Sequence, residues 1–199
     1  MGRKVANLLG LAVLSYLTQG PQHPYELSRQ LRANGDARSI KFTHGSLYMV
    51  VQQLERAGFV AVHGTDQHGR RPERTLYALT EAGRAELRDW MRDLVAEPKH
   101  EYPQFVAALS LIGALPPDEV VPLLRTRLDR LAAIRAGAQA VVDDAVAAGV
   151  HPLFLVEEEY RTALLDAETA FVTRFAERIT DPDTGWGPEW AARIHQEDR

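Results

Sequence analysis

The residues of this sequence with the clearest chemistry lie at positions 41–56, where hydrogen-bonding and cationic side chains occupy one face of a predicted helix. Leu47, Val50, Val51 and Leu54 follow the i, i+3, i+4, i+7 spacing of a buried face. The remaining face and the residues just before the helix are small, polar or cationic apart from one methionine, and comprise Lys41, Thr43, His44, Gly45, Ser46, Tyr48, Met49, Gln52 and Arg56. Glutamine can pair with adenine, arginine with guanine or a phosphate, and a tyrosine hydroxyl with a phosphate. We therefore predict that these residues contact DNA.

A second cationic group lies at positions 68–74, which read His-Gly-Arg-Arg-Pro-Glu-Arg in a polar turn between two predicted strands. Arg70, Arg71 and Arg74 fall within five positions of this projecting turn. Narrow, negative minor grooves and their phosphates attract arginine in particular. We predict that these three arginines also contact DNA.

Enzymatic chemistry has little support in the sequence. The seven histidines are scattered, with no pair at i, i+4, and neither a glycine-rich phosphate loop nor a nucleophile elbow occurs. The acidic runs at 143–144 and 157–159 fall on predicted helices, where consecutive side chains diverge by about 100° instead of converging on one ion. We predict that the chain is not an enzyme and has no catalytic residue, no metal site and no cofactor. For the polar face of the helix that follows Thr43, the alternative to DNA binding is an ordinary solvated surface.

The elements that must position these residues can be predicted from spacing and from turn residues. Apolar residues run almost all round a first helix at 5–17, and Pro24 begins a second helix that stops near Asn34. Thr43 can cap a third helix that Gly58 closes. Strands at 59–65 and 75–80 then form a hairpin. Three helices followed by a hairpin within 85 residues form the winged helix-turn-helix pattern.

The rest of the chain is predicted to be helical. A fourth helix begins near Thr80. Three more helical stretches are predicted, at Phe105–Ile112, Asp118–Ala148 and Leu153–Ile179. The fold class is therefore mainly α with a small β-hairpin. We expect a winged helix-turn-helix DNA-binding domain at 1–85 and a helical dimerisation domain at 86–199, which is also the place for effector sensing.

Apolar stripes on the fourth and last helices are the predicted seams of a homodimer. They comprise Leu87, Trp90, Met91, Leu94, Tyr160, Leu164, Phe171 and Phe175. Two recognition helices about 34 Å apart could read a palindromic double-stranded operator. Each stripe alone could equally pack within its own chain.

Composition and charge agree with this division. Residues 1–92 contain 13 Lys and Arg against 8 Asp and Glu, whereas residues 93–199 contain 10 against 19, so only the first half attracts phosphate. The 199 residues include no cysteine, which suits a reducing compartment. The longest apolar run is far below the ~20 residues that cross a bilayer, and no cleavable leader is evident. We expect a soluble, cytoplasmic protein with no membrane partner.

Several motifs resemble the PadR family of bacterial transcriptional regulators. They are Leu8–Leu11, Gly20–Leu27, Gly45–Tyr48, Gln53–Val60, Gly69–Arg71 and Tyr77–Gly83. Together these motifs cover most of residues 5–90, and their order and spacing make the resemblance specific. The helical second half resembles the longer members of the family, which have a C-terminal dimerisation domain.

The resemblance implies a homodimeric winged-helix regulator, usually a repressor, with phenolic acids or drug-like aromatic compounds as effectors in some members. It places Tyr48 at the family's DNA-contacting tyrosine, and Arg70 and Arg71 at its basic wing. Pro24 stands where many members have glycine, and Met49 where many have proline, so the family's base preferences do not transfer to this chain.

Two further expectations concern a ligand and an alternative function. An aromatic effector pocket at the dimer interface could be lined by residues drawn from Trp90, Tyr102, Phe105, Trp186 and Trp190. The alternative to a DNA-binding regulator is a helical protein–protein adaptor that reuses the winged helix without binding DNA. Such an adaptor should lack the arginine-rich wing and should expose an apolar patch on the third helix.

Overall fold

A computed structural model of the chain describes residues 4–66, 74–183 and 185–197. The chain divides into two compact units, residues 1–100 and 101–199. The domain boundary predicted at residue 85 falls inside α4 (Glu81–Ala96), which belongs with the first unit. The class predicted from sequence, mainly helical with one small hairpin, is confirmed.

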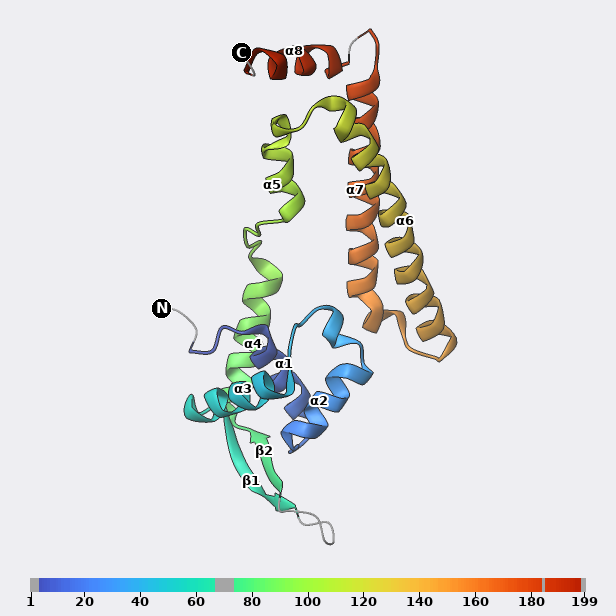
Figure 1. The fold of residues 1–199 in the computed structure, drawn as a ribbon. Helices are drawn as coiled ribbons and strands as arrows, with labels where there is room; N and C mark the ends of the chain where they lie inside the picture. The colour runs from blue at the N-terminus through green and yellow to red at the C-terminus, as the bar shows by residue number, and fades with distance from the viewer. Residues whose placement is uncertain (1–3, 67–73, 184, 198–199) are drawn as a thin grey trace. The chain divides into compact units, whose positions relative to one another are not determined.

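The first unit contains three helices, a hairpin and a fourth helix (Figure 1). In chain order its elements are α1 (Leu8–Tyr16), η1 (Leu17–Gln19), α2 (Pro24–Ala33), η2 (Asp36–Arg38), α3 (His44–Arg56), β1 (Val60–Asp66), β2 (Arg74–Leu79) and α4. The predicted order of helices and strands is therefore confirmed.

The first helix begins later than its apolar pattern suggested. The Asn7 side chain accepts a hydrogen bond from the Leu9 N–H at 2.9 Å and so caps α1, which leaves Val5 outside the helix. Val5 is nevertheless buried in the core, so hydrophobicity indicated its burial correctly but not its helical state. The start of α2 at Pro24 and the start of α4 just after Thr80 agree with the predictions.

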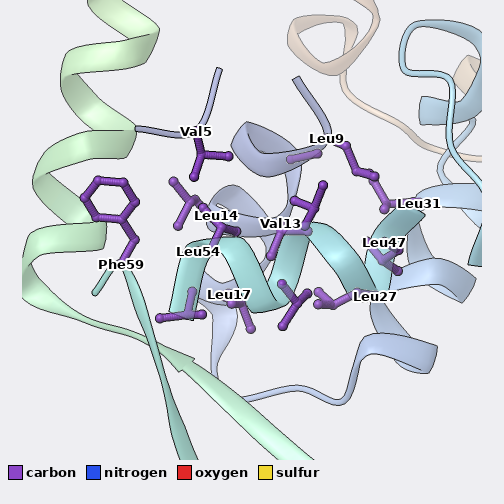
Figure 2. Close-up of a cluster of buried hydrophobic side chains, with 14 residues drawn as sticks. Val5, Leu9, Val13, Leu14, Leu17, Leu27, Leu31, Leu47, Leu54 and Phe59 are labelled. Carbon is purple, nitrogen blue, oxygen red and sulfur yellow. The ribbon is translucent and has the colours of Figure 1, made fainter. Parts of the chain in front are cut away.

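The core of the first unit is formed by α1, α2 and α3 (Figure 2). Buried side chains come from most sides of α1, and only Leu8 and Ser15 of this helix are exposed, in agreement with its nearly continuous apolar sequence. Leu27 and Leu31 of α2 and the buried face of α3 pack against α1, and Phe59 extends the cluster toward the hairpin. This packing leaves α3 with a single outward face.

The hairpin is antiparallel, with Val60 opposite Leu79 and Asp66 opposite Arg74. A register shift between Val62 and Gly64 introduces a bulge into β1. On its other side, β2 forms an isolated bridge in which the backbone N–H groups of Gln22 and Tyr77 each donate to the other residue's carbonyl at 3.0 Å. The hairpin is thereby attached to the segment just before α2.

The base of the hairpin is fixed to α4 by a close backbone junction. The Thr80 hydroxyl donates to the carbonyl oxygens of Gly58 and Phe59, at 2.8 and 3.0 Å, and accepts from the Gly83 N–H at 3.0 Å. A Cβ added at Gly83 would lie 2.0 Å from the Phe59 carbonyl oxygen. Only glycine therefore allows α4 to start so close to β1.

The second unit is entirely helical in the part of the chain that the structure describes. Its elements are α5 (Gln104–Ser110), η3 (Ile112–Ala114), α6 (Pro117–Ala147), η4 (Pro152–Leu155), α7 (Val156–Thr180) and α8 (Gly187–Glu197). The last long helix begins at Val156 and not at Leu153, because residues 152–155 form a 3-10 turn. The helix α8 was not predicted.

The helices α6 and α7 lie side by side as an antiparallel hairpin (Figure 1). At one end Val120, Leu124, Val172, Phe175 and Ile179 form a second core, against which Trp190 of α8 packs. Arginines of α6 pair with carboxylates of α7 along the hairpin: Arg127 with Glu168, and Arg135 with Asp166. Among the described helices, none is long and apolar enough to cross a membrane.

Candidate nucleic-acid interface

The start of α3 is held by a reciprocal cap. The Thr43 hydroxyl accepts from the Ser46 N–H at 3.1 Å, and the Ser46 hydroxyl accepts from the Thr43 N–H at 2.8 Å. This capping box fixes the direction in which α3 leaves the chain. The N–H groups of His44 and Gly45 remain at the positive end of the helix dipole, where they favour an anion such as a phosphate.

The two faces of α3 differ as the sequence predicted. Leu47, Val50, Val51 and Leu54 are buried. The outward residues are exposed, namely His44, Gly45, Tyr48, Met49, Gln52 and Arg56, as are Lys41 and Thr43 before the helix. Ser46 is half-buried by its role in the cap. The structure thus gathers the predicted contacts of this segment on one accessible surface.

The absence of a side chain at Gly45 has no internal cause. A Cβ added there would meet only the Thr43 hydroxyl, at 4.0 Å, and Gly45 does not have a positive φ. An alanine would therefore fit without strain, in contrast to Gly83. The glycine leaves the backbone at the start of α3 bare, which is useful to a ligand that approaches the helix closely.

Two aromatic residues at the start of α2, the cap residue His23 and Tyr25 of the first turn, belong to this surface although they were not among the predicted contacts. Tyr25 stacks on His44 with ring centroids 6.0 Å apart, and His23 lies edge-on to Tyr48 at 6.1 Å. Helix-turn-helix geometry places the start of α2 beside the start of α3, and this was the signal that could have revealed them. The start of α2 therefore widens the candidate surface.

His23 has a defined hydrogen-bonding state. Its Nδ1 accepts from the Tyr25 N–H at 3.0 Å and caps α2. Burial and, secondarily, the charge of Arg74 lower the pKa of His23, against the opposing effect of Glu26. Since a neutral ring with an accepting Nδ1 carries its proton on Nε2, His23 offers one further N–H donor beside Tyr48.

Arg74 is the only predicted wing contact within the described residues. It begins β2, and its guanidinium carbon lies 5.8 Å from the centroid of the Tyr25 ring. Arg74 is thus next to the start of α2, as a wing residue on the same surface should be. Arg70 and Arg71 lie outside the described residues.

The predicted dimer residues of α4 differ in their exposure. Trp90 is only 2% exposed and is therefore already covered. Leu87 and Leu94 are half-buried, with Leu87 packed against the core of the first unit, and Met91 is exposed. Of this stripe, Met91 presents the most surface.

On α7 the predicted dimer residues are more accessible. Tyr160, Leu164 and Phe171 are 67%, 53% and 41% exposed, whereas Phe175 belongs to the core of the second unit. Tyr160 and Leu164 are one helical turn apart and therefore share a face. This face has apolar surface left for a partner.

Three of the residues predicted to line a ligand pocket have different environments. Trp90 is buried, and Tyr102 is 89% exposed. The ring of Phe105 is half-buried and lies 3.5 Å from the guanidinium carbon of Arg127. Arg127 in turn pairs with Glu168, so one face of Phe105 is occupied by a fixed ion pair. Among the described residues, no group of three His, Asp or Glu side chains could hold a metal ion.

Three helices, a hairpin attached beside the second helix, and a third helix with one exposed polar face define a winged helix-turn-helix protein. Residues 13–89 match the family model described as the transcriptional regulator PadR-like family. The match places the domain at residues 13–89 in the PadR-like family, which is a family of transcriptional regulators and not of enzymes. The family resemblance predicted from sequence motifs is confirmed.

Individual relatives agree with the family match. The negative transcriptional regulator PadR of Bacillus subtilis is 27% identical over 124 residues, which cover 62% of this chain and 66% of that protein. The crystal structure of Bacillus subtilis PadR in complex with operator DNA has a TM-score of 0.61 at 21% identity and covers 83% of this chain and 99% of that one. Its complex with p-coumaric acid has a TM-score of 0.58 at 19% identity, over 84% and 99% of the two chains. These structural similarities concern the fold.

Proposed function

We propose that this chain is a homodimeric transcriptional regulator, acting as a repressor, which binds a palindromic operator and is released by a small aromatic effector. The observation that carries the proposal is the exposed face of α3, where Gly45, Tyr48, Gln52 and Arg56 lie on a winged helix of the PadR-like family. Such a face can contact phosphates and base edges together.

The charge of the two units supports the orientation of this complex. The wing and α3 belong to the basic part of the chain, whereas residues 101–199 contain nine arginines and no lysine against 17 Asp and Glu. A phosphate backbone attracts the first part and repels the second. DNA is therefore expected on the α3 and wing surface.

The relatives support both DNA and a small aromatic molecule as partners. The Bacillus subtilis protein is named a negative regulator, and its structures include operator DNA and p-coumaric acid. The adaptor alternative requires an apolar patch on α3, but Met49 is the one aliphatic side chain on its exposed face. DNA binding is the better explanation of this surface.

The test is a titration of the full-length protein into labelled DNA from upstream of its own gene, followed by fluorescence anisotropy at several salt concentrations with excess competitor DNA. Specific binding should survive the competitor, and log K should fall with log salt by about 0.9 for each phosphate contact. Absence of binding at low salt would overturn the proposal and favour the adaptor.

Three variants assign the contacts. Arg70→Ala with Arg71→Ala should weaken binding to every sequence and reduce the salt slope by about 2, because two phosphate contacts are lost. Gln52→Ala should instead cost about 1–3 kcal/mol at one base pair and leave the slope unchanged. Arg84→Ala, an exposed arginine of α4, is the matched control and should bind as the unchanged protein does.

The dimer has its own test by sedimentation. Leu164→Asp should produce monomers and abolish cooperative binding to the palindrome, because a charge would enter the apolar seam. Thr173→Asp, about 180° round α7 on another exposed position, should leave the dimer intact. Dimers that survive Leu164→Asp would place the interface elsewhere.

A further inference from the structure

The tryptophan-rich segment before and within α8 folds back onto α7. The Trp186 N–H donates to the Arg178 carbonyl at 2.8 Å, and the Trp190 N–H donates to the Trp186 carbonyl at 2.9 Å. Trp190 packs on the core of the second unit, whereas Trp186 stays 42% exposed. Core packing therefore explains the presence of a tryptophan at position 190. It does not explain Trp186, whose side chain remains partly exposed.

Trp186 forms one wall of a cavity of about 330 Å³ that lies wholly within the second unit. Leu109 and Ile112 contribute another wall, and Phe171 and Phe175 contribute a third. The two phenylalanine rings stack 5.9 Å apart, and Phe175 meets Trp186 edge-on at 6.3 Å. A cavity of this size, with flat apolar walls, suits a planar ligand of one or two rings.

Two arginines give the cavity a charge that is unlike the rest of the unit. Arg174 and Arg178 both line it, and neither has a carboxylate partner among the described residues. The guanidinium carbon of Arg178 lies 3.6 Å from the Trp186 ring, which holds this cation at the rim. By contrast, Arg127 and Arg135 of α6 are each neutralised by a carboxylate of α7. In an acidic unit, these two cations beside an aromatic cavity favour an anion.

We propose that this cavity binds a planar aromatic anion, with its ring against Phe171, Phe175 and Trp186 and its carboxylate on Arg174 and Arg178. Arginine binds carboxylates through paired hydrogen bonds, and the aromatic walls exclude water from the ring. Of the aromatic residues predicted from sequence as ligand contacts, Trp186 alone lines this cavity. The binding site stands on its own geometry, whereas its coupling to DNA rests on the proposed function.

Isothermal titration calorimetry of the full-length protein tests the site with 2-naphthoate as the anion and 2-naphthalenemethanol as its neutral analogue. Saturable binding of the naphthoate, and binding of the alcohol at least about tenfold weaker, is expected because hydrogen bonds to a charged group contribute most of the difference. Equal binding of both probes, or no saturable binding of naphthoate up to about 1 mM, overturns the proposal.

The variants Arg174→Gln and Arg178→Gln should each weaken naphthoate about tenfold to a hundredfold, since each removes one charged contact. Because Arg178→Gln could also release Trp186, Arg174→Gln is the decisive variant. Arg125→Gln, on an exposed arginine of α6, is the control and should bind unchanged. Wild-type affinity of Arg174→Gln for naphthoate overturns the assignment.

A separate titration of the operator with and without naphthoate tests the link to regulation. Weaker DNA binding in its presence identifies the cavity as the effector site. Calorimetric binding with unchanged DNA affinity refutes the effector role and leaves the site intact. Failure of the protein to bind any DNA refutes the proposed function, while the calorimetry still decides the site.

Discussion

Gly83→Ala tests the junction that holds the wing to α4. An alanine Cβ would lie 2.0 Å from the Phe59 carbonyl oxygen and 2.8 Å from a methyl carbon of Leu79. The carbonyl cannot move away freely, because it accepts hydrogen bonds from both the N–H and the hydroxyl of Thr80. The substitution must therefore displace either the start of α4 or the base of β1.

The expected cost combines two effects. Forcing an extra methyl group into a closely packed place costs about 1–3 kcal/mol. Displacing α4 also weakens the Thr80 cap, whose loss costs about 1 kcal/mol. We expect the free energy of unfolding of the first unit to fall by about 2–4 kcal/mol, and operator binding to weaken as the wing shifts.

Urea titrations read by hydrogen-exchange mass spectrometry can follow peptides of α4 and α6 separately. Gly137→Ala is the control, since a Cβ at this position in α6 meets nothing within 4 Å. It should stabilise the second unit by up to about 1 kcal/mol through helix propensity. A loss below about 0.5 kcal/mol in α4 for Gly83→Ala would refute the reasoning, because that is the range of neutral surface substitutions.

Three further predictions concern stability. Thr43→Ala should cost about 1 kcal/mol of unfolding free energy and Thr43→Ser much less, as measured by urea unfolding, because serine retains the cap. Leu124→Ala should cost about 2–5 kcal/mol, whereas Leu123→Ala, exposed on the same turn, should change stability by less than about 0.5 kcal/mol. Burial and hydrogen bonding to Asp36 raise the pKa of Tyr16 from 10.0 to about 12. Its contribution is therefore complete below pH 10 and is lost as pH rises through 12, so thermal melts over this range should show a steeper loss for the wild type than for Tyr16→Phe; equal slopes would contradict this.

Much of the fold could be predicted from local signals. Thr43 was identified as a helix cap, a helix was predicted to begin near Thr80, and the spacing of Leu47 and Leu54 identified the buried face of α3. These features depend on residues only a few positions apart, so the sequence displays them directly. The family motifs lie in the same part of the chain.

The features that escaped prediction depend on distant residues. Nothing near Tyr25 in the sequence shows that its ring meets His44 and Arg74, which requires the helix-turn-helix geometry. Trp90 was predicted to lie at the dimer interface because it belongs to an apolar stripe of its helix, but it is already buried within one chain. The cavity beside Trp186 combines three separate segments, so periodicity in any one of them could not reveal it.

The bridge between Gln22 and Tyr77 has a consequence for solubility. A hairpin of two strands has two open edges, and an open edge offers unpaired N–H and carbonyl groups to the strands of other molecules. Gln22 covers one edge of β2 at Tyr77, and the bulge between Val62 and Gly64 makes the edge of β1 irregular. The same contacts that aim the wing therefore also protect it against edge-to-edge aggregation when no DNA is bound.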